Sequence, residues 1–584
     1  MGMRYLVLLG GATDKRMALA RQVQARLGLA CILETHEVVV LIEADAQRLL
    51  APGNGGLVIG SLFRRSPLTE RVRDLTPSLW RELGRAEGRG FTRNFWGSYL
   101  ALLLKPDGKG VRVLRDPSGG VPCYHTRHYD MTVIASQVRD LERAGLVSGR
   151  VNWAFVARHL HRPGHHGADT GLADVEELLP GHALALSDLP ASGAHVVERL
   201  WQPWDHALAG HADPDKRLAE MLGALVDKTI GALAGQFSHV VLNLSGGLDS
   251  SIIAAALAHT GVETTCLTLA TPDGEGDERY FAQAVADRLG LALEAHFYDL
   301  ADVDIEKPAA PHLPRPTART FAQGSDRMRQ ALAQERGAQA LFSGDGGDNV
   351  FCLMQSATPV VDRLLAEGPS RGVLATLGDM SRLTRCSMVA VARRALRKYR
   401  QRPYSWPSNA RYLSPRALVL SDALAWHPWL SPPEGTLPGK AAHAALLVRA
   451  QNYPEAYLPG HTPSILPLLA QPLVEFCLSV PTWAWCAHGQ NRSLARAAFA
   501  DRLPSSIIGR RTKGGPDSFC VRIVETQRAR LRALLLDGLL AAERLLDTDA
   551  LAESLSEANL GGADHHRLLA VADAETWARS WSSS

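Results

Sequence analysis

Short apolar runs divided by Gly, Pro and Asp fill the first third of the chain. Runs of this kind, each bounded by turn-forming residues, are typical of strands in an antiparallel sheet. The predicted strands cover residues 38–44, 56–63, 96–104, 111–116, 131–136 and 181–188. The first part of the chain is therefore predicted to be an antiparallel β-sandwich.

The pattern changes beyond about residue 216, where helix-like segments alternate with short apolar runs. It predicts helices over 216–234 and 277–289, and strands over 239–244, 264–270 and 338–342. Helices that alternate with buried strands indicate a parallel α/β sheet. From about residue 359 the strand pattern ends and helical segments dominate.

The two patterns meet in residues 201–216, which contain Pro, Gly and Asp and show no sustained period. Such a stretch is typical of a linker. A chain of 584 residues is long enough for two or more domains, each with its own core. We therefore expect a sandwich domain over residues 1–205 and a parallel α/β domain with added helices over residues 206–584.

Composition and charge change this picture little. A hydrophobic content of 46%, a charged content of 21% and a net charge of +3 describe a globular protein without the basic excess that would favour nucleic acid. The eight cysteines are scattered without a Cys-x-x-Cys pair, so we expect reduced thiols in a cytoplasm. Neither a signal peptide nor a membrane span is predicted.

One glycine-rich loop follows the predicted strand at 239–244 and opens an Ala-rich helix. In this first loop (residues 245–250), Gly246 and Gly247 let backbone amides approach an anion, and Ser250 lies where the positive end of the helix dipole points into the loop. The loop therefore predicts a phosphate site. Asp249 would repel phosphate unless a cation such as Mg²⁺ lay between them, so we expect a metal as well.

A second loop (residues 343–348) repeats this pattern after the strand at 338–342. Because the carboxyl ends of parallel strands share one edge of a sheet, both loops are expected to face the same crevice. Asp249 and Asp348 would then hold one Mg²⁺ on the phosphates of a nucleotide.

These loops carry a family resemblance. "LSGGLDSS" resembles the pyrophosphate loop of the PP-loop ATP-pyrophosphatases, and together with "SGDGGD" it is similar to the asparagine synthetase B family. "NFWGSYLALLL", "RDPSGGVPCYH", "VIASQVRDL" and "ELLPGHAL" resemble that family's glutaminase domain, and "LAQPLVEFCLSVP" and "LPSSIIGRRTKGG" resemble its C-terminal signatures. The resemblance implies an N-terminal-nucleophile (Ntn) type sandwich. It also implies that ATP and Mg²⁺ activate a carboxylate as an acyl-adenylate, which an amine then attacks.

The resemblance also assigns residues. It implies that the nucleotide is bound by Leu244, Ser245, Gly246, Gly247, Leu248, Asp249, Ser250, Leu269, Ser343 and Gly344. Lys513 matches the family lysine that reaches the activated acyl-phosphate, where a compact positive charge neutralises charge in the transition state. Asp345 is expected either to orient or deprotonate the incoming amine, or to act beside the metal.

The chain departs from the family at the glutaminase nucleophile, which is a cysteine at the mature N-terminus. Here the chain begins Met1-Gly2-Met3, and the nearest cysteine is Cys31. We therefore expect no ammonia from glutamine, and an attacking amine that arrives with the substrate.

Several reactions fit such an enzyme. The stretches "SGDGGDNVF", "HPWLSPPEGTLPGKAAH", "LAQPLVEFCLSVPTWAW" and "NRSLARAAFADRLPSSIIGRRTKGG" resemble the lasso peptide macrolactam cyclases, which join an Asp or Glu side chain of a precursor peptide to its N-terminal amine. That resemblance implies a leader-binding protein and a leader peptidase as partners. The alternatives are a β-lactam synthetase-like cyclase, which would carry Tyr at position 345, and an ammonia-dependent asparagine synthetase, which would carry Glu there. Some tRNA-modifying enzymes share the first loop, but the sandwich argues against a nucleic-acid substrate.

Overall fold

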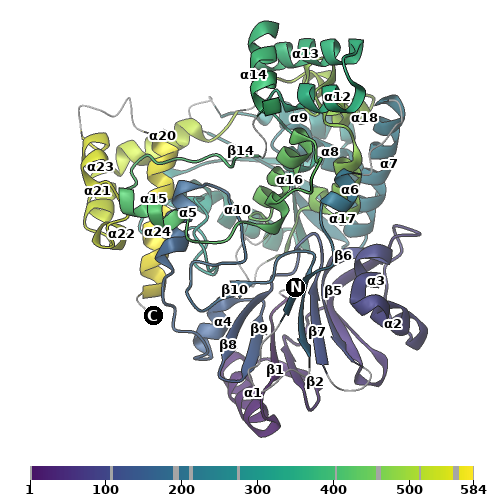
Figure 1. The fold of residues 1–584 in the computed structure, drawn as a ribbon, viewed down its shortest axis with the longest axis vertical. Helices are drawn as coiled ribbons and strands as arrows, with labels where there is room; N and C mark the ends of the chain where they lie inside the picture. The colour runs from purple at the N-terminus through teal and green to yellow at the C-terminus, as the bar shows by residue number, and fades with distance from the viewer. Residues whose placement is uncertain are drawn as a thin grey trace.

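The computed structural model describes residues 3–105, 110–187, 196–208, 215–271, 276–400, 404–454, 462–511, 514–556 and 564–582. Two six-stranded antiparallel sheets form the N-terminal part, and a five-stranded parallel sheet lies in the C-terminal part (Figure 1). The fold is therefore the mixed α/β architecture that the hydrophobic pattern predicted.

The two antiparallel sheets pack face to face. The first contains, in sheet order, β10 (Glu176–Glu177), β8 (Tyr124–His128), β9 (Met131–Ala135), β1 (Tyr5–Gly10), β3 (Val38–Ile42) and β2 (Ala30–Glu34). The second contains β12 (Val196–Arg199), β11 (His182–Ser187), β7 (Gly110–Arg115), β6 (Phe95–Leu104), β5 (Gly56–Arg64) and β4 (Arg48–Leu50). All six strand runs predicted for this part are strands in the structure.

Helices cover the outer faces of this sandwich, which the strand pattern did not predict. In β1, Tyr5 and Val7 point into the core between the sheets, whereas Leu6 and Leu8 pack against α1 (Thr13–Leu27), because side chains alternate along a strand. The second sheet is covered by α2 (Pro77–Gly84) and α3 (Arg89–Asn94) in the same way (Figure 1). The strands are apolar on both faces because both faces are buried.

The parallel sheet carries the remaining strands. In sheet order they are β15 (Ala292–Phe297), β14 (Glu263–Ala270), β13 (His239–Asn243), β16 (Ala340–Ser343) and β17 (Ser464–Ile465), and all neighbours pair in parallel. The three predicted strands are β13, β14 and β16. The sequence pattern did not predict β15, because it is an edge strand that is largely exposed and lacks a continuous apolar run.

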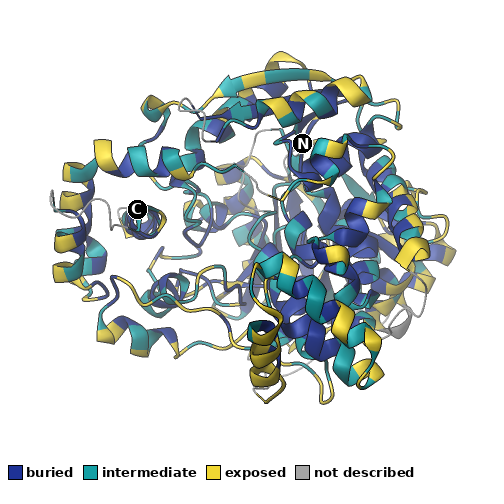
Figure 2. Ribbon diagram, turned by 90° about the horizontal axis from the view of Figure 1, so that it is seen from above, coloured by how far each residue is buried: buried dark blue, intermediate teal, exposed yellow. Residues whose placement is uncertain are grey.

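The remaining helices surround the sheets. They are α4 (Val138–Arg143), α5 (Trp153–His161), α6 (Trp204–Ala207), α7 (Asp215–Ala234), α8 (Leu248–Leu257), α9 (Arg279–Leu289), α10 (Gln323–Glu335), α11 (Gly347–Val350), α12 (Thr358–Glu367), α13 (Arg371–Thr384), α14 (Met388–Arg400), α15 (Pro415–Ser421), α16 (Pro438–Ala450), α17 (Gln471–Ser479), α18 (Ser493–Ala498), α19 (Ser505–Ile508), α20 (Asp517–Thr526), α21 (Arg528–Leu536), α22 (Leu539–Ala542), α23 (Thr548–Ser554) and α24 (His565–Ser582). Exposed residues lie on their outward faces (Figure 2). None of the helices described has the length and apolar content needed to cross a bilayer.

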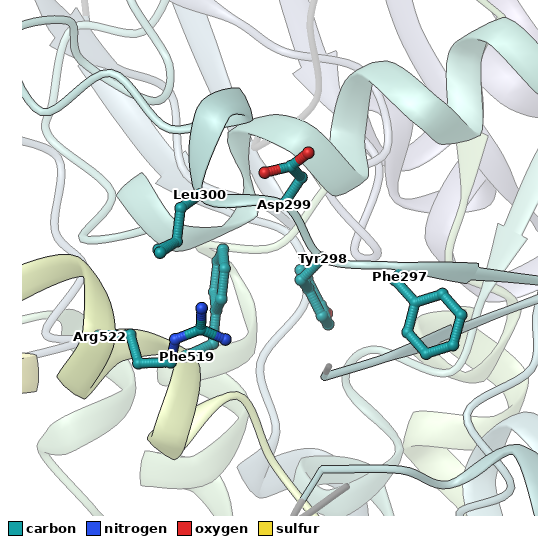
Figure 3. A pocket seen from close by; sticks show the side chains of 6 residues that line it. All are labelled: Phe297, Tyr298, Asp299, Leu300, Phe519 and Arg522. Carbon is teal, nitrogen blue, oxygen red and sulfur yellow. The ribbon is translucent and has the colours of Figure 1, made fainter. Parts of the chain in front are cut away.

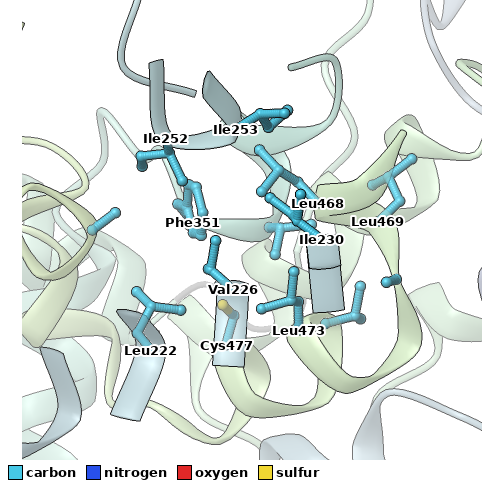
Figure 4. Close-up of a cluster of buried hydrophobic side chains, with 14 of the residues drawn as sticks. Leu222, Val226, Ile230, Ile252, Ile253, Phe351, Leu468, Leu469, Leu473 and Cys477 are labelled. Atoms are coloured by element: carbon cyan, nitrogen blue, oxygen red, sulfur yellow. The ribbon is translucent and has the colours of Figure 1, made fainter. Parts of the chain in front are cut away.

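The largest core lies on one face of the parallel sheet. Helices α7, α8 and α17 contribute Val226, Ile230, Ile252, Ile253 and Leu473, which meet in one cluster (Figure 4). The opposite face packs against α10 through Leu332 and Ala333. The sheet is thus buried on both sides, and its carboxyl edge remains for a site.

The sandwich and the parallel part share buried polar contacts. Glu177 accepts a hydrogen bond from Arg115 at 2.6 Å and one from Arg315 at 3.1 Å, and His166 Nε2 lies 3.1 Å from its carboxylate. Burial alone would raise the pKa of Glu177, but His166, Arg315 and Arg115 together hold it well below its ordinary value. The carboxylate is therefore charged and shared between the two parts.

The predicted linker begins where the sandwich contacts the parallel part. Trp201 and Trp204 are buried, and the Trp201 indole donates to Glu475 at 2.7 Å. Residues 209–214 lie outside the described ranges. The division at residue 205 therefore stays a prediction, and the described start of the linker packs as core.

Candidate active site

Two neighbouring strands, β13 and β16, end at one polar cavity of about 210 Å³. Their last residues, Asn243 and Ser343, are partners in the sheet register. The predicted site residues that line the cavity are Ser245, Gly247, Asp249, Ser250, Ser343, Gly344, Asp345 and Asp348. The sheet topology thus brings both loops to one place.

The first loop is shaped by its own serines. Ser245 N donates to Ser250 Oγ at 3.2 Å, and Gly247 N donates to Ser245 Oγ at 3.3 Å. Ser251 Oγ donates to Gly247 O at 2.7 Å. Helix α8 begins at Leu248 without a side-chain cap, so its first amides remain donors for an anion at the positive end of the helix dipole.

Gly246 is required by both its conformation and its surroundings. Its φ of 66° lies in the left-handed region, and a Cβ there would lie 2.6 Å from Phe281 Cβ. The backbone of the first loop therefore packs directly on the start of α9.

Glycines of the second loop allow the two loops to touch. A Cβ on Gly344 would lie 2.8 Å from Ser250 N, and a Cβ on Gly347 would lie 2.5 Å from Asp249 Cγ. The second loop is also held from outside, because Asn349 Nδ2 donates to Leu446 O of α16 at 2.7 Å. The two loops form a single contact surface.

Asp249 and Asp348 converge on one cation, Arg492. Arg492 Nη1 donates to Asp249 Oδ2 at 2.7 Å, and the same nitrogen bonds to Asp348 Oδ1. The Asp249 side chain is 11% exposed and the Asp348 side chain 46% exposed. The two carboxylates are therefore close enough to share a positive charge.

The electrostatics of this region follow from burial and from these charges. Burial raises the pKa of Tyr453, which lines the cavity, and the nearby Asp345 and Asp348 raise it further. Burial lowers the pKa of Arg496 to about 10, and the adjacent Arg492 contributes. The Tyr453 phenol consequently stays protonated and is a hydrogen-bond donor beside the acids.

A pair of carboxylates suits Mg²⁺ on phosphates. Magnesium usually takes one or two protein carboxylates, keeps several waters and uses phosphate oxygens for its remaining positions. No group of three or more His, Cys, Asp or Glu side chains that could hold a metal occurs among the residues described. The donor set of Asp249 and Asp348 therefore fits a magnesium ion that arrives with a nucleotide.

Other predicted residues lie apart from the cavity. Leu244 and Leu248 are buried in the large core. Leu269 lines a narrow space together with Tyr298 and Phe519. Their assignment to the nucleotide stays a prediction.

Lys513 lies outside the described residues, but the chain on either side of its segment is described. Arg510 Nη1 donates to Gly246 O at 3.0 Å, and the Arg510 guanidinium pairs with Glu278. Gly514 N donates to the same carboxylate. Glu278 thus binds both Arg510 and Gly514, and Arg510 also binds the backbone of the first loop.

Arg492, Tyr453, Asn243 and Asn349 were missed in the sequence. Arg492 stands in the stretch "NRSLARAAFADRLPSSIIGRRTKGG", so its segment was recognised but its role was not. No local pattern marks Tyr453, which reaches the cavity only through tertiary packing.

A comparison with known protein families gives an extensive match. The asparagine synthase family model matches residues 222–579. A tRNA-specific 2-thiouridylase MnmA of Rhizorhabdus wittichii is 34% identical over 131 residues, which are 20% of this chain and 34% of that protein. The chain therefore spans about a third of the length of this curated relative.

Two solved structures are distant matches. Glutamine phosphoribosylpyrophosphate amidotransferase from B. subtilis, complexed with ADP and GMP, has a TM-score of 0.23 at 10% identity and covers 58% of this chain and 90% of its own. The allosteric regulatory enzyme of purine biosynthesis has a TM-score of 0.22 at 11% identity, and the match covers 59% of this chain and 84% of that enzyme. Resemblances this distant support no conclusion about this chain.

Proposed function

Because this chain belongs to the asparagine synthase family, we propose that it is an ATP-dependent amide-forming ligase, and specifically a lasso peptide macrolactam cyclase. A side-chain carboxylate of Asp or Glu in a precursor peptide attacks the α-phosphorus of ATP and displaces pyrophosphate. The N-terminal amine of the same peptide then attacks the acyl carbon, loses a proton and releases AMP. The product is an isopeptide-closed ring.

The observation that carries this proposal is the meeting of two acidic, glycine-rich loops at one sheet edge. Backbone amides of residues 245–248 and the hydroxyls of Ser245 and Ser250 would hold the β- and γ-phosphates. Asp249 and Asp348 would exchange Arg492 for Mg²⁺, which neutralises phosphate charge when it is bound. In the family's pattern, Leu244, Leu269, Ser343 and Gly344 would surround the adenosine and Lys513 would reach the acyl-phosphate.

The residues that line the cavity also favour an attacking amine that arrives with the substrate. Asp345 lines it together with Tyr453, and a carboxylate in that place is suited to orient or deprotonate an amine. In the sandwich, Cys123 is buried, and burial raises the pKa of the Cys31 thiol, with Glu34 contributing. Neither thiol is suited to glutamine hydrolysis, because the thiolate is the nucleophile.

The remaining proposals concern organisation and context. The sandwich over residues 1–205 would serve as an inactive glutaminase-like domain, and residues 206–584 as the synthetase domain. A leader-binding protein and a leader peptidase would deliver the peptide. All eight cysteines carry free thiols, which fits a cytoplasmic enzyme.

The test is a reaction of the purified full chain with ATP, Mg²⁺ and a synthetic peptide encoded near its gene. We expect the peptide to lose the mass of one water, with one AMP and one pyrophosphate formed per ring. Tandem mass spectrometry should place the new bond between the N-terminal amine and an acidic side chain. Release of ADP and phosphate, or amide formation only with added ammonia, would overturn the assignment.

A further inference from the structure

A second and larger hollow lies at the carboxyl edge of the parallel sheet, as the proposed site does. Its volume is about 540 Å³, and its lining residues are Phe297, Tyr298, Asp299, Leu300, Phe519 and Arg522 (Figure 3). None of these residues lines the cavity between the two loops. The hollow is thus a separate feature, built from the end of β15 and from α20.

The walls of this hollow are aromatic. Phe519 is buried, and its ring centroid lies 5.1 Å from that of Tyr298. Phe297, in contrast, is 47% exposed at the end of an edge strand, where Arg279 lies over its ring at 4.6 Å. An exposed ring beside a buried aromatic ring offers apolar area that a ligand could cover.

One cation stands at the side of the hollow. Arg522 lies three residues after Phe519 on α20, so both side chains project from the same face of the helix. Among the residues described, no hydrogen bond or ion pair engages the Arg522 guanidinium, whereas the Asp299 carboxylate already accepts from Ala301 N at 2.9 Å. Arg522 is therefore available to a carboxylate or a peptide carbonyl.

The distance to the first loop follows from the sheet order. β15 is separated from β13 by β14 alone, and neighbouring strands are about 4.8 Å apart, so the hollow begins about 10 Å along the edge from the first loop. Three residues of extended chain span about that length. Leu269 on β14, which the family's pattern assigns to the adenosine, lines a narrow space together with Tyr298 and Phe519.

From these observations we propose that the hollow binds a large apolar, preferably aromatic, side chain of the peptide substrate, close in sequence to the acid that is activated. Arg522 binds a main-chain carbonyl or carboxylate next to that side chain. This inference rests on the proposed function for the identity of the peptide, but the binding itself does not require catalysis.

The test uses small probes with the full chain. Binding of N-acetyl-L-phenylalanine amide, N-acetyl-L-phenylalanine and N-acetyl-L-alanine amide is measured by saturation-transfer NMR. We expect the phenylalanine probes to bind and the alanine probe not to bind. Phe297→Ala should weaken the binding of both phenylalanine probes about tenfold. Arg522→Gln should remove the advantage of the free carboxylate over the amide.

Tyr129→Ala is the matched control, since that ring is 85% exposed in a turn of the sandwich. Thermal shift by Mg²⁺-ATP should be unchanged in all three variants. Equal binding of the phenylalanine and alanine probes, or equal binding by Phe297→Ala and the parent chain, would refute the proposal. Loss of the Mg²⁺-ATP shift in Phe297→Ala would assign the hollow to the nucleotide instead.

The outcomes also separate this inference from the proposed function. If no peptide releases pyrophosphate but the phenylalanine probes bind as expected, the cyclase assignment fails and the aromatic site stands. If cyclisation is observed, Phe297→Ala should raise the KM for a peptide with an aromatic residue near its acid and leave the KM for ATP unchanged.

Discussion

The first and second loops follow the same plan yet are supported differently. Both follow a strand of the parallel sheet, both carry glycines, and both place an acid in the first turn of a helix. The first loop is closed by its own serines and continues into the ten-residue, buried α8. The second leads into the four-residue α11, which is hydrogen-bonded to α16 through Asn349 and His443.

This difference separates what local sequence dictates from what tertiary packing supplies. A loop whose polar groups satisfy one another keeps its shape with little outside help. A loop anchored by another helix depends on how that helix is held. We therefore expect the first loop to keep its conformation by itself. The position of the second loop should depend on the helix that holds it.

The largest effects should come from the two acids. Asp249→Asn and Asp348→Asn should each slow pyrophosphate release about a thousandfold or more, because a metal ligand contributes several kcal/mol to charge stabilisation. Their effects on folding should differ. Asp249→Asn should lower the free energy of unfolding by about 1–3 kcal/mol, since its carboxylate is buried against Arg492, and Asp348→Asn by less than about 1 kcal/mol.

Steady-state pyrophosphate release and urea denaturation measure these two quantities. Parent-like pyrophosphate release in both variants would contradict a shared magnesium. Equal losses of stability would contradict the difference in burial.

The next effect should come from separating the loops. In Gly347→Ala the new methyl would lie 2.5 Å from Asp249 Cγ, so the second loop must move away from the first. A displacement of about 1 Å in a reacting assembly costs about a hundredfold in rate. Gly84→Ala is the control, because its methyl would meet nothing within 4 Å. A normal rate in Gly347→Ala would show that the contact between the loops is dispensable.

A smaller effect should distinguish the serines of the two loops. Ser250→Ala removes the acceptor for Ser245 N and should cost about 1 kcal/mol of stability and about tenfold in rate. Ser343→Ala removes only the acceptor for Asp345 N and should cost less on both measures. Parallel kinetics and thermal denaturation of the two variants decide this. A larger loss in Ser343→Ala would reverse the comparison.

The last effect concerns stability alone and is a pH dependence tied to the second loop. Burial lowers the pKa of His443 to about 3, with Lys440 contributing, and its Nε2 lies 3.0 Å from Val350 O. The unfolded chain binds this proton near pH 6.5, so the stabilisation is complete above pH 6.5 and is lost as pH falls toward 3. The slope is at most about 1.4 kcal/mol for each pH unit.

His443→Gln should therefore lose less stability than the parent chain between pH 7 and pH 5. Urea denaturation at both pH values gives the difference. An identical loss in the two proteins would show that His443 does not titrate as a buried neutral ring.

The sequence predicted the family and the fold class, and the match over residues 222–579 and the observed sheets confirm both. It succeeded with β13 and β16 because buried parallel strands are continuous apolar runs, and with the loops because their glycines and acids are local signals. It could not predict α1 or β15, since α1 follows a strand run without an N-capping side chain and β15 is half exposed.

Arg492 shows why the sequence could predict only part of the candidate site. Its guanidinium reaches Asp249 and Asp348 across more than a hundred residues of sequence. No spacing rule connects positions so far apart, because their proximity is set by tertiary packing, including that of α18 against α7. Convergence of the two acids was an expectation from topology, whereas the cation between them came from tertiary structure.

The shared carboxylate of Glu177 has a consequence for how this chain can be divided. Arg115 approaches it from the sandwich and Arg315 from the parallel part, and all three groups are buried. Separating the halves would leave Glu177 with Arg115 and His166 but would remove Arg315, so part of the pairing that compensates for the burial of these charges would be lost. The buried ion cluster thus gives the sandwich a structural role at the boundary of the two parts, because Glu177 supplies the partner of the buried Arg315.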